Sequence, residues 1–323
     1  MTRSLTLPAP ARAASPAAAV ASLLMATSAW GSLFFVGKSM LAVLDPLWFT
    51  TIRYLLATLL LVALRPAFGA APLTRLVRDL RPLALLGLAG YGAFSVLVFF
   101  GVALSVPSHG AVIMATMPVT TVLLRWWLDG VRPPRTAVAA AGLALVGVAL
   151  VAGVFAHRSG VGTRALFGDL LALVGTLGWV TYTRGAARFP DLSPFDYTAF
   201  TAMASLPVLL LAAAVASTAG HVPWPDAGAV LHRAPTLAYI AVVPTVAAAV
   251  AFNFGVRRLG AATGTLFINC VPISALLIAT ALGQPPGAQE ILGAVLVGLA
   301  LVVTTRPVRK TSQAPLRPCG ATS

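Results

Sequence analysis

Residues 238–282 read AYIAVVPTVAAAVAFNFGVRRLGAATGTLFINCVPISALLIATAL, and this stretch decides the fold. Two apolar stretches flank a short basic turn, Arg257-Arg258-Leu259-Gly260. Each apolar stretch has roughly 20 residues, which at about 1.5 Å per residue is enough to cross a hydrocarbon core about 30 Å thick as a helix. The pattern therefore predicts a hairpin of two membrane-spanning helices.

The same pattern occurs earlier in the chain, over residues 83–128. At a constant spacing of 154 residues, five positions of the two hairpins are identical, and they pair Phe100 with Phe254, Gly101 with Gly255, Val102 with Val256, Gly110 with Gly264 and Pro118 with Pro272. Similar spacings pair Trp30 with Trp179, Pro46 with Pro194, Gly142 with Gly293 and Gly147 with Gly298. We therefore expect two repeats, residues 15–156 and 164–305, and disordered tails over residues 1–14 and 306–323.

The composition indicates a membrane protein. The chain is 59% hydrophobic and 9% charged, whereas soluble domains carry about 25% charged residues. The net charge of +14 does not indicate nucleic acid as a partner, because Lys and Arg occupy short gaps between apolar stretches and form no basic stripe with stacking aromatic residues. We expect the lipid bilayer as a partner, and the two cysteines have no spacing typical of a metal site. No cofactor or metal is expected.

The apolar stretches predict an all-α membrane protein with ten transmembrane helices. The spans are residues 16–37, 47–64, 83–104, 109–128, 136–155, 167–184, 194–216, 236–255, 261–282 and 287–304. Each repeat has five spans, and because five is odd, the second repeat enters the membrane upside down relative to the first. Two inverted five-helix repeats are an architecture of secondary transporters, in which the substrate lies near the midplane between the repeats.

Basic residues predict the orientation. Seventeen of the 22 Lys and Arg residues lie in tails and loops on the side of the N-terminus. Four lie on the opposite side, namely Lys38, Arg158, Arg164 and Arg233, and Arg53 lies within a span. Because positive charge accumulates on the cytoplasmic side, we expect a multi-pass protein of the cell (inner) membrane with both termini in the cytoplasm.

Several short motifs in both repeats resemble the drug/metabolite transporter superfamily, and specifically its EamA-type members. In the first repeat they are Trp30-Gly31-Ser32 with Lys38, Leu44-Asp45-Pro46 and Ile52-Arg53-Tyr54. In the second they are Gly178-Trp179, Leu192-Ser193-Pro194, Asn253 with Arg257-Arg258-Leu259-Gly260-Ala261, and Val271-Pro272. The resemblance implies a ten-helix carrier of small organic solutes such as metabolites, amino acids or drugs, often an exporter.

Two carboxylates that are frequent in this family are absent here. Val271 stands where relatives often have Glu before the proline of the ninth helix, and Gln284 replaces the Glu of a Leu-Gly-Glu motif. The resemblance therefore does not imply that a carboxylate couples transport to an energy source.

We expect a secondary transporter and not an enzyme, working by alternating access. The alternatives are an integral-membrane transferase, which needs clustered acids or histidines at one membrane face, and a non-transporting sensor or scaffold.

Arg53 is the strongest candidate for a substrate-binding residue. It lies about six residues into its span, which is roughly 9 Å deep in a helix. A charge near the centre of a membrane helix costs about 2.5–3.5 kcal/mol on insertion scales, so such a residue usually has a partner or a task. Arg53 could line a central cavity and bind an anionic group of the solute, or it could extend to the membrane surface and pair with Asp45.

The other candidates are aromatic and amide side chains within spans. Trp30 and Trp179 occupy matching positions and could form two walls of a cavity, with Tyr91 and Tyr182 as further wall residues, or they could anchor helices at the interface. Asn253 and Asn269 could line the pathway or join helices by hydrogen bonds.

The eight acidic residues all fall in loops or near predicted span ends, which disfavours a carboxylate relay in the middle of the membrane. His109 lies at the start of a span and is expected to be an interface residue rather than a proton relay.

Overall fold

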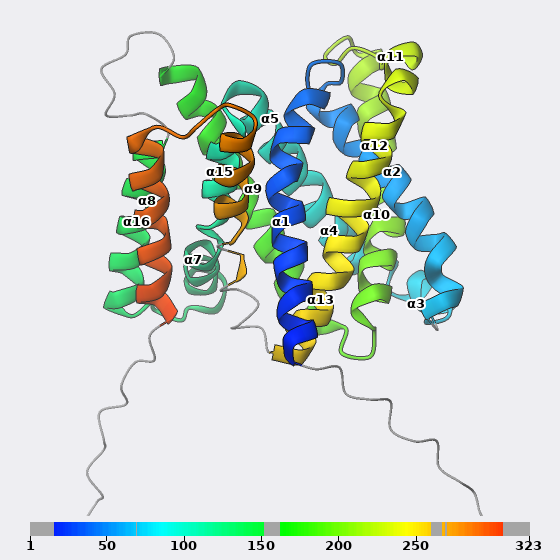
Figure 1. Ribbon diagram of the computed structural model, residues 1–323. Coiled ribbons are helices and arrows are strands. Elements are labelled where there is room, and N and C mark those ends of the chain that lie inside the picture. Colours follow the sequence, from blue (N-terminus) through cyan, green and yellow to red (C-terminus); the bar gives the residue numbers. More distant parts are fainter. Residues whose placement is uncertain (1–15, 69, 152–161, 260–266, 269, 306–323) are drawn as a thin grey trace, which may run out of the picture.

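The computed structural model describes residues 16–68, 70–151, 162–259, 267–268 and 270–305, and within these ranges every regular element is a helix (Figure 1). The expectation of an all-α protein is confirmed there. The two predicted tails, residues 1–14 and 306–323, and the candidate Asn269 lie outside the described residues.

The first repeat begins with two long helices joined by a short turn. Its elements are α1 (Pro16–Met40), α2 (Pro46–Leu64), η1 (Arg65–Phe68), α3 (Leu73–Arg78), α4 (Leu80–Gly87), η2 (Leu88–Ala93), α5 (Phe94–Leu104), α6 (Pro107–Met114), α7 (Met117–Asp129) and α8 (Arg135–Val151). The start of α2 is encoded locally. The Asp45 carboxylate accepts a hydrogen bond from the Leu47 amide, and Pro46 occupies the first helical turn, where its missing N–H is not needed.

The second repeat has a similar order of elements. They are α9 (Gly162–Gly185), η3 (Ala186–Arg188), α10 (Pro194–Thr218), α11 (Ala227–His232), α12 (Ala234–Ile240), η4 (Ala241–Ala247), α13 (Ala248–Leu259), α15 (Cys270–Ala281) and α16 (Ala288–Thr305). The start of α10 repeats that of α2, because the Ser193 hydroxyl accepts a hydrogen bond from the Asp196 amide and Pro194 follows at once.

Six helical segments in the described ranges are long and apolar enough to cross a membrane, and each overlaps a predicted span. They are residues 16–40, 46–68, 80–104, 163–188, 194–218 and 234–256. The predicted span 109–128 is two helices, α6 and α7, bent by 52° at a break just before Pro118, so it counts as a seventh span only if the bent pair crosses as one. Residues 135–151, 270–281 and 288–300 form shorter apolar helices, and the count of ten stays a prediction.

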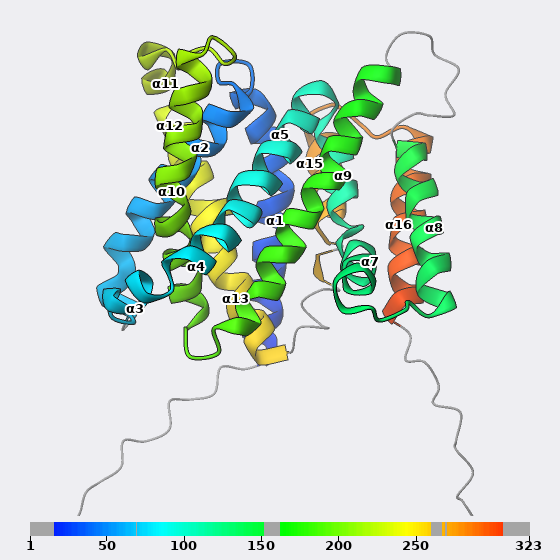
Figure 2. The same cartoon turned by 180° about the vertical axis from the view of Figure 1, so that it is seen from behind.

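Helices of one repeat pack against helices of the other in a reciprocal way (Figures 1 and 2). The end of the third span of each repeat packs on the first span of the other, α5 on α9 and α13 on α1. Gly101 of α5 lies so close to α9 that a Cβ there would be 2.4 Å from the Gly168 carbonyl oxygen. Its matching residue, Gly255 of α13, lies equally close to Leu23 of α1. The sequence repeat is therefore also a repeat of contacts.

The matching last helices, α8 and α16, lie side by side (Figure 1). A Cβ at Gly147 or at Gly293 would meet the backbone carbonyl of the other glycine at 2.7 Å or 2.4 Å, so small residues let these helices approach closely. The matching first helices run in opposite directions, because α1 begins at the lower end of the molecule in Figure 1 and α9 begins at the upper end. We use "lower end" for the end where α1 begins and "upper end" for the end where it finishes.

The third span of each repeat contains a π-helical segment, and the two segments match. These are η2 in the first repeat and η4 in the second. The spacing of 154 residues that pairs the two hairpins places η2 over residues 242–247, within η4. π-Helical turns inside α-helices are frequent at functional sites, and both segments lie against the cavity described below.

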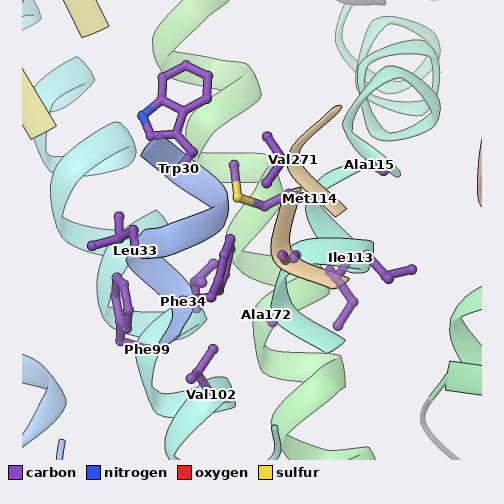
Figure 3. Close-up of a cluster of buried hydrophobic side chains, with 14 of the residues drawn as sticks. Trp30, Leu33, Phe34, Phe99, Val102, Ile113, Met114, Ala115, Ala172 and Val271 are labelled. Atoms are coloured by element: carbon purple, nitrogen blue, oxygen red, sulfur yellow. The ribbon is translucent and has the colours of Figure 1, made fainter. Parts of the chain in front are cut away.

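The largest hydrophobic core joins the two repeats. It is built mainly from α1, α5, α6 and α9, with Val271 of α15 inserted between them (Figure 3). The part of this core nearest the upper end of the molecule, which points downward in Figure 3, contains side chains that are at most 3% exposed. They are Phe34, Phe49, Phe99 and Val102. This packed layer separates the centre of the molecule from its upper end.

Candidate functional site

A cavity of about 90 Å³, measured as the space open to the centre of a water-sized sphere, lies between the two repeats. Helices of both repeats line it. Six of the seven predicted site residues are among the lining side chains, namely Trp30, Arg53, Tyr91, Trp179, Tyr182 and Asn253. The seventh, Asn269, lies outside the described residues. The structure therefore brings together six side chains that are spread over more than 220 positions of the sequence.

The cavity extends toward the lower end. Its lining includes Leu61, Thr183 and Asn253, each within two turns of the lower end of its helix. No lining residue lies in the last turn of α1 or α5 at the upper end, where the layer around Phe34 and Phe99 closes it. In this conformation the upper end is closed and the lower end is where the cavity approaches the surface.

Arg53 is buried in the cavity wall, with 3% of its surface exposed. Its Nη2 donates a hydrogen bond of 2.7 Å to the Ser95 hydroxyl, which also lies 3.1 Å from the Tyr54 hydroxyl. The guanidinium carbon lies 4.5 Å from the centre of the Tyr54 ring and 5.2 Å from that of Phe99, and these rings stabilise the cation through their π faces. Its Nε has no hydrogen-bond partner among the described residues.

Asp45 does not pair with Arg53, because the carboxylate caps α2 instead. Within the described ranges, no carboxylate forms an ion pair with Arg53. Of the two interpretations of Arg53 from sequence, the structure has the side chain in the cavity wall and not at the membrane surface. A buried cation with aromatic neighbours and no ionic partner among the described residues is able to accept an anionic group, and a role of Arg53 in binding solute stays a prediction.

Trp30 and Trp179, which occupy matching positions of the two repeats, contact one another at the cavity. Their ring centres are 6.0 Å apart and nearly perpendicular, a geometry that aromatic pairs prefer. Trp30 also donates a 3.0 Å hydrogen bond from Nε1 to the carbonyl oxygen of Pro244 in η4. The indole therefore fixes one π-helical segment from across the boundary between the repeats.

Two tyrosine hydroxyls form a second polar patch on the wall, and the buried Thr201 hydroxyl lies behind them. The Tyr91 and Tyr182 hydroxyls are 2.7 Å apart, and the Tyr91 hydroxyl is 3.1 Å from the hydroxyl of Thr201. The Tyr54 ring packs on that of Tyr91 with 4.6 Å between centres. The cavity thus has aromatic walls, a cation on the side of α2 and hydroxyls on the side of α10.

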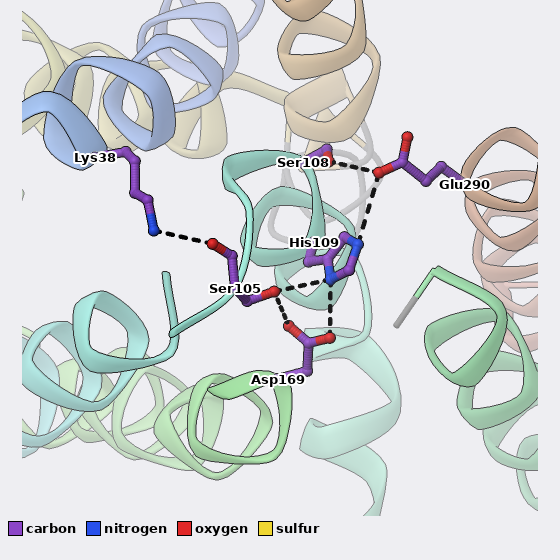
Figure 4. A network of polar contacts seen from close by, with 6 residues as sticks. All are labelled: Lys38, Ser105, Ser108, His109, Asp169 and Glu290. Carbon is purple, nitrogen blue, oxygen red and sulfur yellow. Dashed lines mark hydrogen bonds and ion pairs between the residues drawn. The ribbon is translucent and has the colours of Figure 1, made fainter. Parts of the chain in front are cut away.

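A second cluster of polar residues lies at the upper end, and the sequence reasoning missed it (Figure 4). His109 is buried there between helices, and the expectation that it lies at the membrane interface stays a prediction. Its Nδ1 lies 2.9 Å from the Asp169 carboxylate, and its Nε2 lies 3.6 Å from that of Glu290. The sequence did contain an indication of this cluster. His109, Asp169 and Glu290 all lie near the starts of predicted spans that begin on the same side of the membrane.

This cluster does not have the geometry of a catalytic triad. A triad needs the serine on one ring nitrogen of the histidine and the carboxylate on the other. Here the Ser105 hydroxyl and the Asp169 carboxylate both lie 2.9 Å from Nδ1, and the Ser105 hydroxyl donates to Asp169 at 2.8 Å. Among the described residues, no group of three or more His, Cys, Asp or Glu side chains is arranged to hold a metal ion.

Comparison with known proteins gives a family and several relatives. The model of the EamA-like transporter family matches residues 17–153 and 166–306, once in each repeat. The uncharacterized transporter YrdR of Bacillus subtilis is 27% identical over 292 residues, which are 89% of this chain and 91% of YrdR. The uncharacterized inner membrane transporter YedA of Escherichia coli K12 is 27% identical over 266 residues, 79% of either chain.

A solved crystal structure has a similar fold. It matches with a TM-score of 0.63 and 20% sequence identity, and the match covers 90% of this chain and 97% of the other. At this identity the likeness shows the fold alone.

Proposed function

Because this chain belongs to the EamA-like transporter family, we propose that it is a secondary transporter that carries a small organic anion by alternating access. The cavity between the repeats is the solute site in this proposal. The family and the relatives are transporters of multi-pass membrane type. The substrate class, the mechanism and the direction are our own inference, and we take the direction to be export.

The observation that carries the proposal is Arg53. Burial of a charge without an ionic partner is costly, and in the described part of the chain Arg53 has only the Ser95 hydroxyl and aromatic rings. A solute with a carboxylate would supply the missing negative charge, and a charge-assisted hydrogen bond to the guanidinium is about twice as strong as a neutral one. The apolar part of the solute would lie against Trp30 and Trp179, which face the same cavity.

The proposed architecture is ten spans in two inverted five-helix repeats. The reciprocal packing of α5 on α9 and of α13 on α1 supports it, as do the opposite directions of α1 and α9. In this arrangement the lower end faces the cytoplasm, and both termini lie there. The cavity would then load from the cytoplasm, and closure of the lower end with opening of the upper end would release the solute.

A transport assay in proteoliposomes tests the function. Purified protein is reconstituted, and a panel of labelled solutes is offered, each carboxylate together with its neutral amide analogue. We expect saturable transport of at least one carboxylate and little transport of its amide. Arg53→Gln should abolish this preference, whereas Arg188→Gln, at an exposed site outside the cavity, should keep it. If Arg53→Gln transports the accepted carboxylate as well as the wild type, Arg53 does not bind it.

Reporter fusions test the orientation separately. A reporter that is active only in the cytoplasm, fused after residue 70, should be active, and fusions after residues 160 and 225 should be inactive. The reverse pattern would place the lower end outside the cell, and the cavity would then load from the exterior.

A further inference from the structure

The cluster at the upper end connects the two repeats by charge. His109 comes from α6 of the first repeat, and Asp169 and Glu290 come from α9 and α16 of the second. The exposed fractions of the three side chains are 10%, 3% and 25%. These contacts are therefore largely shielded from water, and they hold together helices that must separate if the upper end is to open.

The geometry favours a proton on His109. A neutral imidazole has one N–H and can donate from one nitrogen only, whereas the imidazolium can donate from both. Both nitrogens face carboxylates, at 2.9 Å and 3.6 Å. Without the proton, the buried carboxylate of Asp169 and the partly buried carboxylate of Glu290 would lie beside a neutral ring, and uncompensated buried charge is destabilising.

We propose that His109, Asp169 and Glu290 form a proton-binding site that couples closure of the upper end to uptake of one proton from that side. On closing, neutral His109 takes a proton from solution, and the charge of the three groups changes from −2 to −1. On opening, the imidazolium leaves the carboxylates and enters water, where a histidine loses its proton near neutral pH. The coupling role rests on the transport function proposed above.

The neighbouring charged groups are consistent with this assignment. The carboxylates are also held by uncharged donors, because Ser108 donates to Glu290 at 3.1 Å and the Gly287 amide donates at 2.9 Å. Lys38 of α1 donates to the carbonyls of Val102, Ala103 and Ser105 at the end of α5, and it forms no ion pair with the cluster. Arg164 is exposed on α9, and α5 and α15 contain no Lys, Arg, Asp or Glu. The only such residue of α8 is Arg135, which begins that helix at the lower end, away from this site.

The helices that carry the cluster also line the cavity. Five residues below His109, α6 contributes Met114 to the cavity wall, and α9 carries Trp179 below Asp169. The break between α6 and α7, with its 52° bend, lies just beyond Met114. A shift of α6 away from α9 at the upper end would therefore both separate the ion pairs and loosen the layer above the solute.

A pH titration of the purified full-length protein in lipid nanodiscs tests the proposal without any solute. Cys270 and Cys319 are replaced by Ala, and an environment-sensitive fluorophore is attached to Val106→Cys, an exposed position just before α6. Between pH 5.5 and 8.5 the emission should follow one transition. The ratio of open to closed protein should increase with pH by at most about tenfold per pH unit, which is the limit when opening releases a single proton.

Two substitutions of His109 give opposite expected results. His109→Gln cannot be charged, so its emission should equal the high-pH value at every pH. His109→Lys has a permanent cation between the carboxylates, so its emission should equal the low-pH value at every pH. A merely misfolded protein would not give opposite end states. His232→Gln, in α11 at the same end, is the control and should titrate like the wild type.

The two carboxylates should differ in their effect. Asp169→Asn should move the transition to lower pH, and Glu290→Gln should move it in the same direction by less, because Glu290 is farther from the ring and more exposed. The proposal is overturned if the wild type shows no transition or one of opposite sign, or if His109→Gln keeps the transition. Because the titration contains no solute, the proton-site proposal can fail while the proposed transport function holds. It can also hold if the protein transports none of the solutes in the panel.

Discussion

The second helices of the two repeats, α2 and α10, begin alike, but only α2 brings a charged side chain to the cavity. Both start with a capping side chain followed by proline, Asp45-Pro46 and Ser193-Pro194. At the same spacing of 148 residues, Arg53 of α2 matches Thr201 of α10. The guanidinium carries a charge to one wall, and the threonine hydroxyl only supports the Tyr91 hydroxyl on the other.

This difference shows how a symmetric frame can hold an asymmetric site. The helix starts, the π-helical segments and the close glycine contacts occur in both repeats, and they position the walls. Of the two matching positions only one carries a charge, so in the proposed transport function an anionic end of the solute has one preferred wall. Opening and closing would then use the pseudosymmetry, while the solute would bind in a single orientation.

Removing the charge should have the largest effect. In Arg53→Thr the two matching positions carry the same residue, and the cavity loses its cation. A hydrogen bond to a charged group contributes about 1.5–3 kcal/mol, so transport of the accepted carboxylate should fall roughly 10- to 150-fold. Initial rates in proteoliposomes measure this.

The control for this variant is Arg188→Thr, which removes a cation from an exposed site. It should leave the rates within about twofold, as expected for a surface substitution. A loss of equal size in both variants would mean that overall charge and not the cavity matters.

The next test compares the matching glycines, Gly101 and Gly255. A Cβ at Gly101 would meet the backbone oxygen of Gly168, whereas one at Gly255 would meet the side chain of Leu23, both at 2.4 Å. A side chain can adjust more easily than a helix backbone. Gly101→Ala should therefore destabilise by about 1–3 kcal/mol, the usual cost of overpacking, and Gly255→Ala by less. Thermal unfolding of the two purified variants measures the difference, and equal losses would contradict it.

The sequence allowed much of the frame to be predicted. The apolar stretches located all six long spans. In lipid a helix satisfies its own backbone hydrogen bonds, so a long apolar stretch is enough to predict a spanning helix. Matching positions also gave a shared cavity as one of two interpretations of Trp30 and Trp179, and both side chains line the cavity of the structure. Whether these residues bind solute stays a prediction.

Other features could not be predicted in this way. A π-helical segment such as η2 depends on tertiary packing, and its sequence, LAGYGA, differs little from that of an ordinary membrane helix. Ser95 was not considered as the partner of Arg53, because serine is frequent throughout the spans. The ion pairs of His109 involve residues 60 and 181 positions away, and considering each acid by its own span hid their common location.

Substitution of either matching tryptophan should have a smaller effect than the changes above, and it should be seen in stability. Trp30→Phe removes the N–H that bonds the Pro244 carbonyl, and a buried carbonyl without its donor costs about 1–3 kcal/mol. The Trp179 ring forms no hydrogen bond with the described residues, so Trp179→Phe should cost less. Thermal unfolding should rank the variants in this order. The reverse order would show that the indole of Trp30 does not hold η4.

The smallest effect should come from Thr201, the counterpart of Arg53. Thr201→Val keeps the shape and removes the hydroxyl that lies 3.1 Å from that of Tyr91. The Tyr91 hydroxyl retains Tyr182 at 2.7 Å, so the net loss should be at most about 1 kcal/mol, or about fivefold in the apparent affinity for the solute. Concentration dependence of transport measures it, with Thr218→Val, at the exposed end of α10, as the control. A loss as large as that of Arg53→Thr would mean that both walls hold the charged end, and the single orientation inferred from the unequal pair would be wrong.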